Sequence, residues 1–135
     1  MDIEIVIGLP GSGKSHLLEK FKEQGYEIYD DFISSFYDCK LISETGKMCI
    51  ADPRLCDYNN FLHYIKFFAN RKIHLTLFEN EPSQCLTNIQ TREANGDNRD
   101  ITRDLNLFTK MYDLKNYMNY DHIVLPVYSF SLPSK

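Results

Sequence analysis

Glycine is scarce in this sequence, with only 6 in a chain of 135 residues. Three of them, Gly8, Gly11 and Gly13, fall inside one stretch of eight residues near the start. Glycine is favoured where the backbone must adopt conformations that side chains forbid. The clustering therefore indicates one local structure with a special backbone.

Paired cysteines and long apolar runs are also missing. The four cysteines, Cys39, Cys49, Cys56 and Cys85, form no C-x-x-C pair, and no His lies at zinc-ligand spacing from two of them. No apolar run approaches the roughly 20 residues that span a bilayer, and the start of the chain lacks the pattern of a signal peptide. We therefore expect one cytoplasmic domain over residues 1–135, with reduced, buried thiols and no membrane partner.

The chain has no excess of basic residues. Its formal net charge is -4 and its pI is about 5.5. Bulk attraction will not draw such a protein to a polyanion, so any nucleic-acid site must be local.

Apolar runs alternate with stripes of helical spacing along the whole chain. Runs bounded by turn residues predict strands, and stripes with caps predict helices. We expect strands at 3–7, 26–29, 48–51, 73–78 and 122–127, and helices at 14–25, 57–68, 82–93 and 101–117, with a further short helix after Asp31. The order predicts an α/β fold in which a mostly parallel five-stranded sheet carries helices on both faces. Composition predicts a mobile loop at 93–100 and a disordered tail at 131–135.

The glycine cluster belongs to a phosphate-binding motif. The pattern G-x-x-x-x-G-K-[ST] is matched by Gly8-Leu9-Pro10-Gly11-Ser12-Gly13-Lys14-Ser15, between an expected strand and an expected helix. In such a loop the backbone amides surround phosphate oxygens, the lysine reaches the outer phosphates, and the serine hydroxyl helps to hold Mg²⁺. An ordinary glycine turn would need neither Lys14 nor Ser15.

Two further acidic positions follow expected strands. Asp52, after the strand at 48–51, has the position from which NTPases reach Mg²⁺ directly or through water, although a turn residue before Pro53 is the alternative. Asp30, after the second strand, is our candidate for the base that deprotonates an accepting hydroxyl. The alternative is a helix cap, a role that suits Asp31 better.

Three arginines surround the polar loop. Arg92, Arg99 and Arg103 bracket a segment at about 93–103 that we interpret as a mobile lid whose arginines neutralise phosphate charge during transfer. Arg99 is our first choice for the catalytic arginine. Neighbouring carboxylates offer the alternative of a solvated, salt-bridged surface.

These motifs together resemble the polynucleotide-kinase-like P-loop kinases, especially the kinase domain of bacteriophage 5′-polynucleotide kinases. IVIGLPGSGKSHLL is similar to the phosphate loop of that family, YDDF to its second-strand aspartate pair, and IADPRL to its third-strand aspartate. The resemblance implies a three-layer P-loop NTPase fold of adenylate-kinase-like arrangement, with Asp30 as the catalytic base. It also implies a viral or phage origin.

One departure from the family bears on the substrate. Members of the polynucleotide type carry an arginine three residues after the catalytic aspartate, and this sequence has Ile33 there. Arg54 could reach the same space from the third strand. Phosphoryl transfer is thus better supported than a polynucleotide acceptor.

The sequence therefore favours a kinase that uses ATP and Mg²⁺. Its acceptor is a hydroxyl on a nucleic-acid end of DNA or RNA, a modified base in nucleic acid, a nucleoside or a nucleotide. An NTPase or nucleotide switch with water as acceptor, and a binding module without catalysis, are the alternatives.

Overall fold

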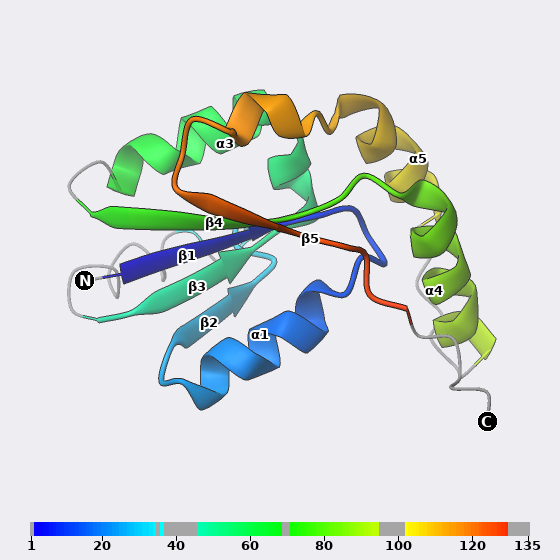
Figure 1. Ribbon diagram of the computed structural model, residues 1–135, viewed down its shortest axis with the longest axis horizontal. Helices are drawn as coiled ribbons and strands as arrows, with labels where there is room; N and C mark the ends of the chain where they lie inside the picture. The colour runs from blue at the N-terminus through cyan, green and yellow to red at the C-terminus, as the bar shows by residue number, and fades with distance from the viewer. Residues whose placement is uncertain (1, 35, 37–45, 69–70, 95–101, 130–135) are drawn as a thin grey trace.

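Five parallel strands form one sheet in the computed structural model (Figure 1), which describes residues 2–34, 36, 46–68, 71–94 and 102–129. The strands are β1 (Asp2–Ile7), β2 (Glu27–Asp30), β3 (Met48–Ala51), β4 (Lys72–Phe78) and β5 (His122–Leu125). Their order across the sheet is β2-β3-β1-β4-β5, and every pair is parallel. The predicted fold class is confirmed.

The register of the sheet brings three chain segments together at one edge. Ala51 of β3 pairs with Val6 of β1 on one side and with Asp30 of β2 on the other. The residues that follow these strands therefore leave the sheet side by side. In an open parallel sheet this carboxyl edge is where ligands bind.

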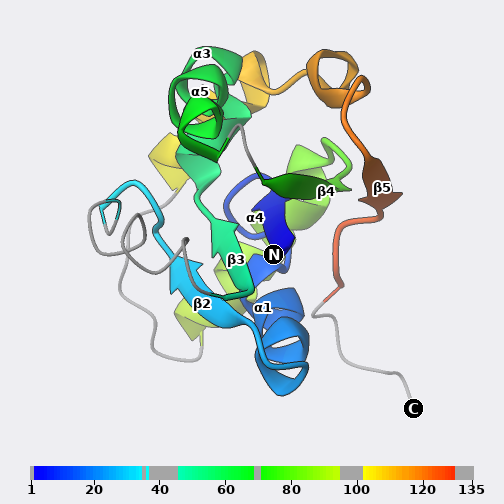
Figure 2. The same ribbon diagram turned by 90° about the vertical axis from the view of Figure 1, so that its left-hand side faces the viewer.

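Helices cover both faces of the sheet (Figure 2). One face carries α1 (Lys14–Glu23), and the other carries α3 (Tyr58–Ile65) and α5 (Thr102–Met111), whereas α4 (Pro82–Ala94) lies beyond the carboxyl ends of the strands.

Alternation along β1 explains the two layers. Ile3, Ile5 and Ile7 point into the larger core with Phe61 of α3 and Leu105 of α5. Val6 points to the opposite face, where it packs in a smaller cluster with Leu18 of α1. A strand buried on both faces reads as a continuous apolar run, as this one does.

Helix ends follow local chemistry. Asp57 caps α3, since its side chain accepts a hydrogen bond from the amide of Asn59 at 3.0 Å. Pro82 is the first residue of α4, where its missing N–H costs nothing. Beyond α1, Gly25 adopts a left-handed φ of 92°, the conformation in which helices commonly stop.

Several elements are shorter than the sequence predicted. The helix expected at 57–68 ends at Ile65 and is followed by a 3-10 turn, Lys66–Phe68, and the helix expected at 14–25 ends at Glu23. The helix expected at 101–117 ends at Met111, because extended Asp113 caps a separate 3-10 turn, Leu114–Tyr117, by accepting from the amide of Lys115. The strand expected at 122–127 ends at Leu125, since Pro126 has no N–H to continue the ladder.

Other expectations fall outside the described residues. These are most of the short helix after Asp31, the middle of the lid at 95–101, and the tail at 131–135. Cys49, Cys56 and Cys85 are buried free thiols, as expected, and Cys39 is outside the described part. Within the described ranges, no helix is both long and apolar enough to cross a membrane.

Candidate active site

The glycine-rich loop connects β1 to α1 at the carboxyl edge of the sheet. Gly11 and Gly13 have φ values of 83° and 107°, the left-handed region that side chains disfavour, and Gly13 is the N-cap of α1. A Cβ on Gly11 would lie 2.6 Å from the carbonyl oxygen of Cys85. A Cβ on Gly13 would lie 2.5 Å from the Cβ of Tyr128. These two positions therefore require glycine for both backbone angle and space.

Two residues that the sequence did not single out hold this loop in place. The buried side-chain amide of Asn88, on α4, donates to the carbonyl oxygen of Gly11 at 2.8 Å and to that of Tyr128. The amide of Tyr128 in turn donates to the carbonyl of Ser12 at 2.9 Å. Asparagine has a poor helix propensity, so its presence inside an expected helix was the one feature of the sequence that could have pointed to Asn88.

Lys14 is the buried cation of the loop. It is 8% exposed, and its Nζ donates to the carbonyl oxygens of Gly8 and Leu9, both at 2.8 Å. Burial lowers the pKa of Lys14, and the negative charge of Asp30 opposes that shift. The ammonium is thus held at the loop, close enough to Asp30 for their charges to interact.

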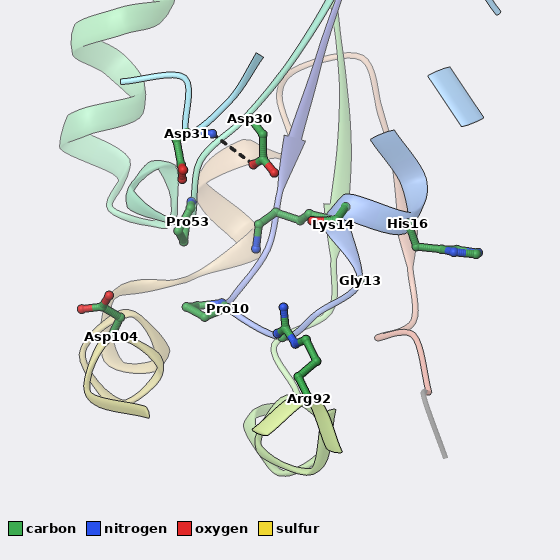
Figure 3. Close-up of a pocket in the computed structure, with 11 residues that line it drawn as sticks. Pro10, Gly13, Lys14, His16, Asp30, Asp31, Pro53, Arg92 and Asp104 are labelled. Atoms are coloured by element: carbon green, nitrogen blue, oxygen red, sulfur yellow. Dashed lines mark hydrogen bonds between the residues drawn. The ribbon is translucent and has the colours of Figure 1, made fainter. Parts of the chain in front are cut away.

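The loop forms one wall of a cleft of about 300 Å³. Figure 3 shows Lys14 and Arg92 facing this space from the loop and from α4, with Asp30, Asp31 and Asp104 on its other sides. The side chain of His16 points away from the cleft, and its ring contacts that of Tyr128 with centroids 4.4 Å apart. The cleft is lined by Pro10, Gly11, Gly13, Lys14, Ser15, His16, Asp30, Asp31, Pro53, Arg92 and Asp104.

The aspartate pair lies at the end of β2. Partial desolvation raises the pKa of Asp30, and the nearby charges of Asp31 and Asp52 raise it further. The amide of Asp31 opposes this shift by donating to Oδ1 of Asp30 at 3.0 Å. Asp31 has a φ of 53°, a conformation that Asp adopts more readily than most residues. The turn at Asp31 therefore presents both carboxylates to the cleft.

Asp52 is fully buried, and the structure surrounds it with nitrogen donors. Its Oδ1 accepts from the backbone amide and Nε of Arg54, both at 2.9 Å. Its Oδ2 accepts from Nη2 of Arg54 at 2.8 Å and from the amide of Ile33 at 3.0 Å. A bidentate arginine pair of this kind is among the strongest hydrogen-bonded ion pairs in proteins.

The same pair fixes the segment after β2. Nη2 of Arg54 also donates to Oγ of Ser34 at 3.1 Å, and the amide of Phe32 donates to the carbonyl of Ala51 at 3.0 Å. Ile33 packs against the larger core. Asp52 and Arg54 thus position the turn that carries Asp30 and Asp31, a role that the sequence did not indicate.

The three lid arginines have different positions. Arg92 lines the cleft from α4 (Figure 3). Arg103 is exposed on α5 and is not among the described residues that line the cleft. Arg99, our first choice from the sequence, lies outside the described residues, so its role stays a prediction.

The fold and the loop define a class. Five parallel strands in this order, with the phosphate loop after β1, are a P-loop NTPase fold of the small-kinase type. A gluconokinase from Sinorhizobium meliloti 1021 has a similar structure, with a TM-score of 0.68 and 13% identity over 98% of this chain and 84% of that one. A deoxyadenosine kinase from M. mycoides with bound dATP gives a TM-score of 0.51 and 14% identity over 94% and 91% of the two chains. At these identities the likeness shows the fold alone.

A viral relative shows the family. The "Uncharacterized protein R277" of Acanthamoeba polyphaga mimivirus is 41% identical over 133 residues, which cover 92% of this chain and 95% of the viral protein. The chain belongs to the same family as this mimivirus protein. No family model matches the sequence. The viral origin that the resemblance implied is matched by a relative from a virus, but this virus is mimivirus and not a phage.

Replacing Gly11 by alanine should damage the loop more than an equivalent change elsewhere. Gly25 is the matched control, because its φ of 92° is also left-handed but nothing lies within 4 Å of the position that a Cβ would take. We expect Gly25→Ala to cost about 1–2 kcal/mol of unfolding free energy from backbone strain alone. Gly11→Ala should cost more and also weaken ATP binding. Urea unfolding and equilibrium dialysis measure the two effects, and equal losses in the two variants would contradict the close packing.

Removing the Arg54 side chain should destabilise the protein strongly. Of the four donors described above, the buried carboxylate of Asp52 would keep the two backbone amides, and a buried charge that loses its partner costs about 2–4 kcal/mol. Arg103→Ala, an exposed arginine of α5, is the control, with an expected change within about 0.5 kcal/mol. Denaturant unfolding of both variants checks this. An Arg54→Ala protein as stable as the parent would show that the ion pair does not hold the turn.

Proposed function

We propose that this protein is a kinase that uses ATP and Mg²⁺ to phosphorylate a hydroxyl group of an acceptor. The observation that carries the proposal is that Asp30 and Lys14 both face the same cleft (Figure 3). A phosphate-binding cation and a carboxylate able to accept a proton are the two groups that transfer to a hydroxyl requires. The small-kinase fold and the kinases with similar structures support the proposal.

The loop fits the phosphates of a nucleoside triphosphate. Its left-handed glycines turn the backbone around an open concave wall, and the N-terminus of α1 adds a partial positive charge there. Lys14 now bonds the carbonyls of Gly8 and Leu9, and it can exchange them for phosphate oxygens without leaving the loop. Arg92 adds a second cation beside the phosphates.

Ser15 is the residue placed to hold the metal. It is exposed in the first turn of α1 and lines the cleft. Mg²⁺ keeps several waters and prefers phosphate oxygens with one or two protein ligands, so it needs no cage of carboxylates. In the described part of the chain, no three His, Cys, Asp or Glu side chains are grouped to hold a metal. When bound, the ion neutralises charge on the transferred phosphate.

The predicted metal role of Asp52 takes a specific form in this proposal. The four hydrogen bonds described for its carboxylate all come from nitrogen donors, so a direct bond to the ion requires Arg54 to move away. In this proposal the main role of Asp52 is to hold the turn that carries Asp30.

Asp30 is the proposed base. The acceptor hydroxyl passes its proton to the carboxylate of Asp30 while its oxygen bonds to the γ-phosphorus and the bond from that phosphorus to the bridging oxygen of ADP breaks. Partial desolvation raises the pKa of Asp30, which increases its affinity for that proton. Arg92, together with Arg99 and Arg103 of the proposed lid, neutralises charge that moves to the leaving group.

Replacing Asp30 by asparagine should separate binding from transfer. We expect the rate of label transfer from γ-labelled ATP to hydroxyl acceptors to fall by about 10²- to 10⁴-fold, the usual contribution of a general base. ATP affinity should change little, because the phosphates are held by the loop. The acceptor panel includes sugars, nucleosides, and DNA and RNA with 5′-hydroxyl ends. Lys14→Ala is the comparison variant, and it should lose ATP binding itself.

The pH profile provides the control for this assignment. A base must be deprotonated, so kcat/KM should fall as pH drops through the pKa of Asp30, which lies above the ordinary value of 3.8. The acidic limb should vanish in Asp30→Asn. ATP hydrolysis that is unaffected by this variant and by every acceptor would contradict the base role and favour an NTPase with water as acceptor.

A further inference from the structure

The charges of the cleft are unevenly distributed. Three carboxylates, those of Asp30, Asp31 and Asp104, line it; Figure 3 shows Asp30 and Asp31 near the end of the Lys14 side chain and Asp104 apart from them on α5. Among the described residues that line the cleft, the lysine and arginine side chains are Lys14 and Arg92, both beside the loop. The triphosphate of a bound nucleotide is itself negative and would engage these two cations. An acceptor in the same cleft would therefore have these carboxylates as its remaining charged neighbours among the described residues.

Arg54, which follows β3 at this edge of the sheet, already uses its guanidinium to bind another residue of the protein. Arg54 gives Nε and Nη2 to the buried carboxylate of Asp52 and a further bond to Ser34. Hydrogen bonding to Asp52 also raises the pKa of Arg54, as expected for a cation held by its partner. Turning Arg54 toward a substrate phosphate would leave Asp52 charged and buried, which is costly. Arg54 therefore does not replace the phosphate-binding arginine that the sequence lacks.

At the position of that missing arginine, residue 33, the structure does not direct a side chain into the cleft. Ile33 is partly buried, and its side chain packs against the larger core. Its backbone amide is used by Asp52. A cationic side chain at this position would have to leave the core to reach the cleft.

From this distribution we propose that the acceptor is a polyhydroxyl compound of the sugar or nucleoside class that carries no phosphate or carboxylate. The proposal rests on the kinase function above and specifies its substrate. Carboxylates accept hydrogen bonds from hydroxyl groups readily, whereas an anion opposite them is repelled by like charge. A nucleotide or a nucleic-acid strand, which brings phosphates next to its hydroxyl, fits poorly beside these carboxylates.

Matched acceptors in which an anionic group replaces or modifies one hydroxyl test the proposal. A nucleoside and its 3′-monophosphate share the same free 5′-hydroxyl, and the open-chain compounds glucitol and gluconate share their hydroxyl groups at C2 to C6. With γ-labelled ATP and the whole chain, we expect kcat/KM to be about tenfold or more higher for the uncharged member of the pair that reacts, as repulsion across a partly solvated cleft implies.

Charge reversal on α5 supplies the residue-level test. Asp104→Lys should reduce the preference for the uncharged acceptor by about tenfold. Glu23→Lys, the same change at the far end of α1, should leave the preference unchanged. Because a lysine in the first turn of α5 opposes the helix dipole, Asp104→Asn is a second variant that removes the charge with less risk to folding.

The outcomes separate the two proposals. Efficient labelling of the anionic member of each pair, or a preference that neither Asp104 variant alters, overturns the assigned acceptor class and leaves the kinase function standing. If ATP binds but no acceptor is labelled, the kinase function fails and the acceptor class falls with it. ATP binding, measured by equilibrium dialysis in the same samples, distinguishes that result from a misfolded protein.

Discussion

The buried carboxylate of Asp52 is the constraint on which the acceptor side of the cleft depends. It follows β3 and accepts four hydrogen bonds, one from the amide of Ile33 in the segment after β2 and three from Arg54. These bonds fix the turn in which Asp30 and Asp31 face the phosphate loop. Because the Asp52–Arg54 ion pair is partly shielded from water, it contributes more to the stability of this turn than an exposed ion pair would.

The wall that the glycine-rich loop forms depends on backbone conformation more than on charged side chains. Gly11 and Gly13 allow the loop its left-handed turns, and Asn88 joins the loop to α4 and to the segment after β5. The cations of Lys14 and Arg92 and the carboxylates of Asp30 and Asp31 thus line one cleft. In the proposed reaction a donor phosphate and a proton-accepting carboxylate must meet across a short gap, and this cleft holds both kinds of group.

Local patterns in the sequence predicted the sheet, its parallel strands and the phosphate loop, because each follows from residues close together in the chain. The partners of Asp52 and the role of Asn88 could not be predicted, since they depend on contacts between distant segments. The early end of α5 was missed because the exposed Asp113, which follows the buried Tyr112, caps a separate 3-10 turn instead of continuing the helix. The sequence allowed Arg54 to reach the space of the missing arginine, and only the fold shows that its guanidinium is bound to Asp52.

A crystal structure with a non-hydrolysable ATP analogue and Mg²⁺ tests the central claim most directly. The account predicts that Nζ of Lys14 leaves the carbonyls of Gly8 and Leu9 for the outer phosphates, and that the γ-phosphate faces the carboxylate of Asp30 with room for a hydroxyl between them. The Asp52–Arg54 pair should remain intact. A triphosphate bound away from the loop, or a γ-phosphate separated from Asp30 by protein, would contradict the assignment of this cleft as the site of transfer.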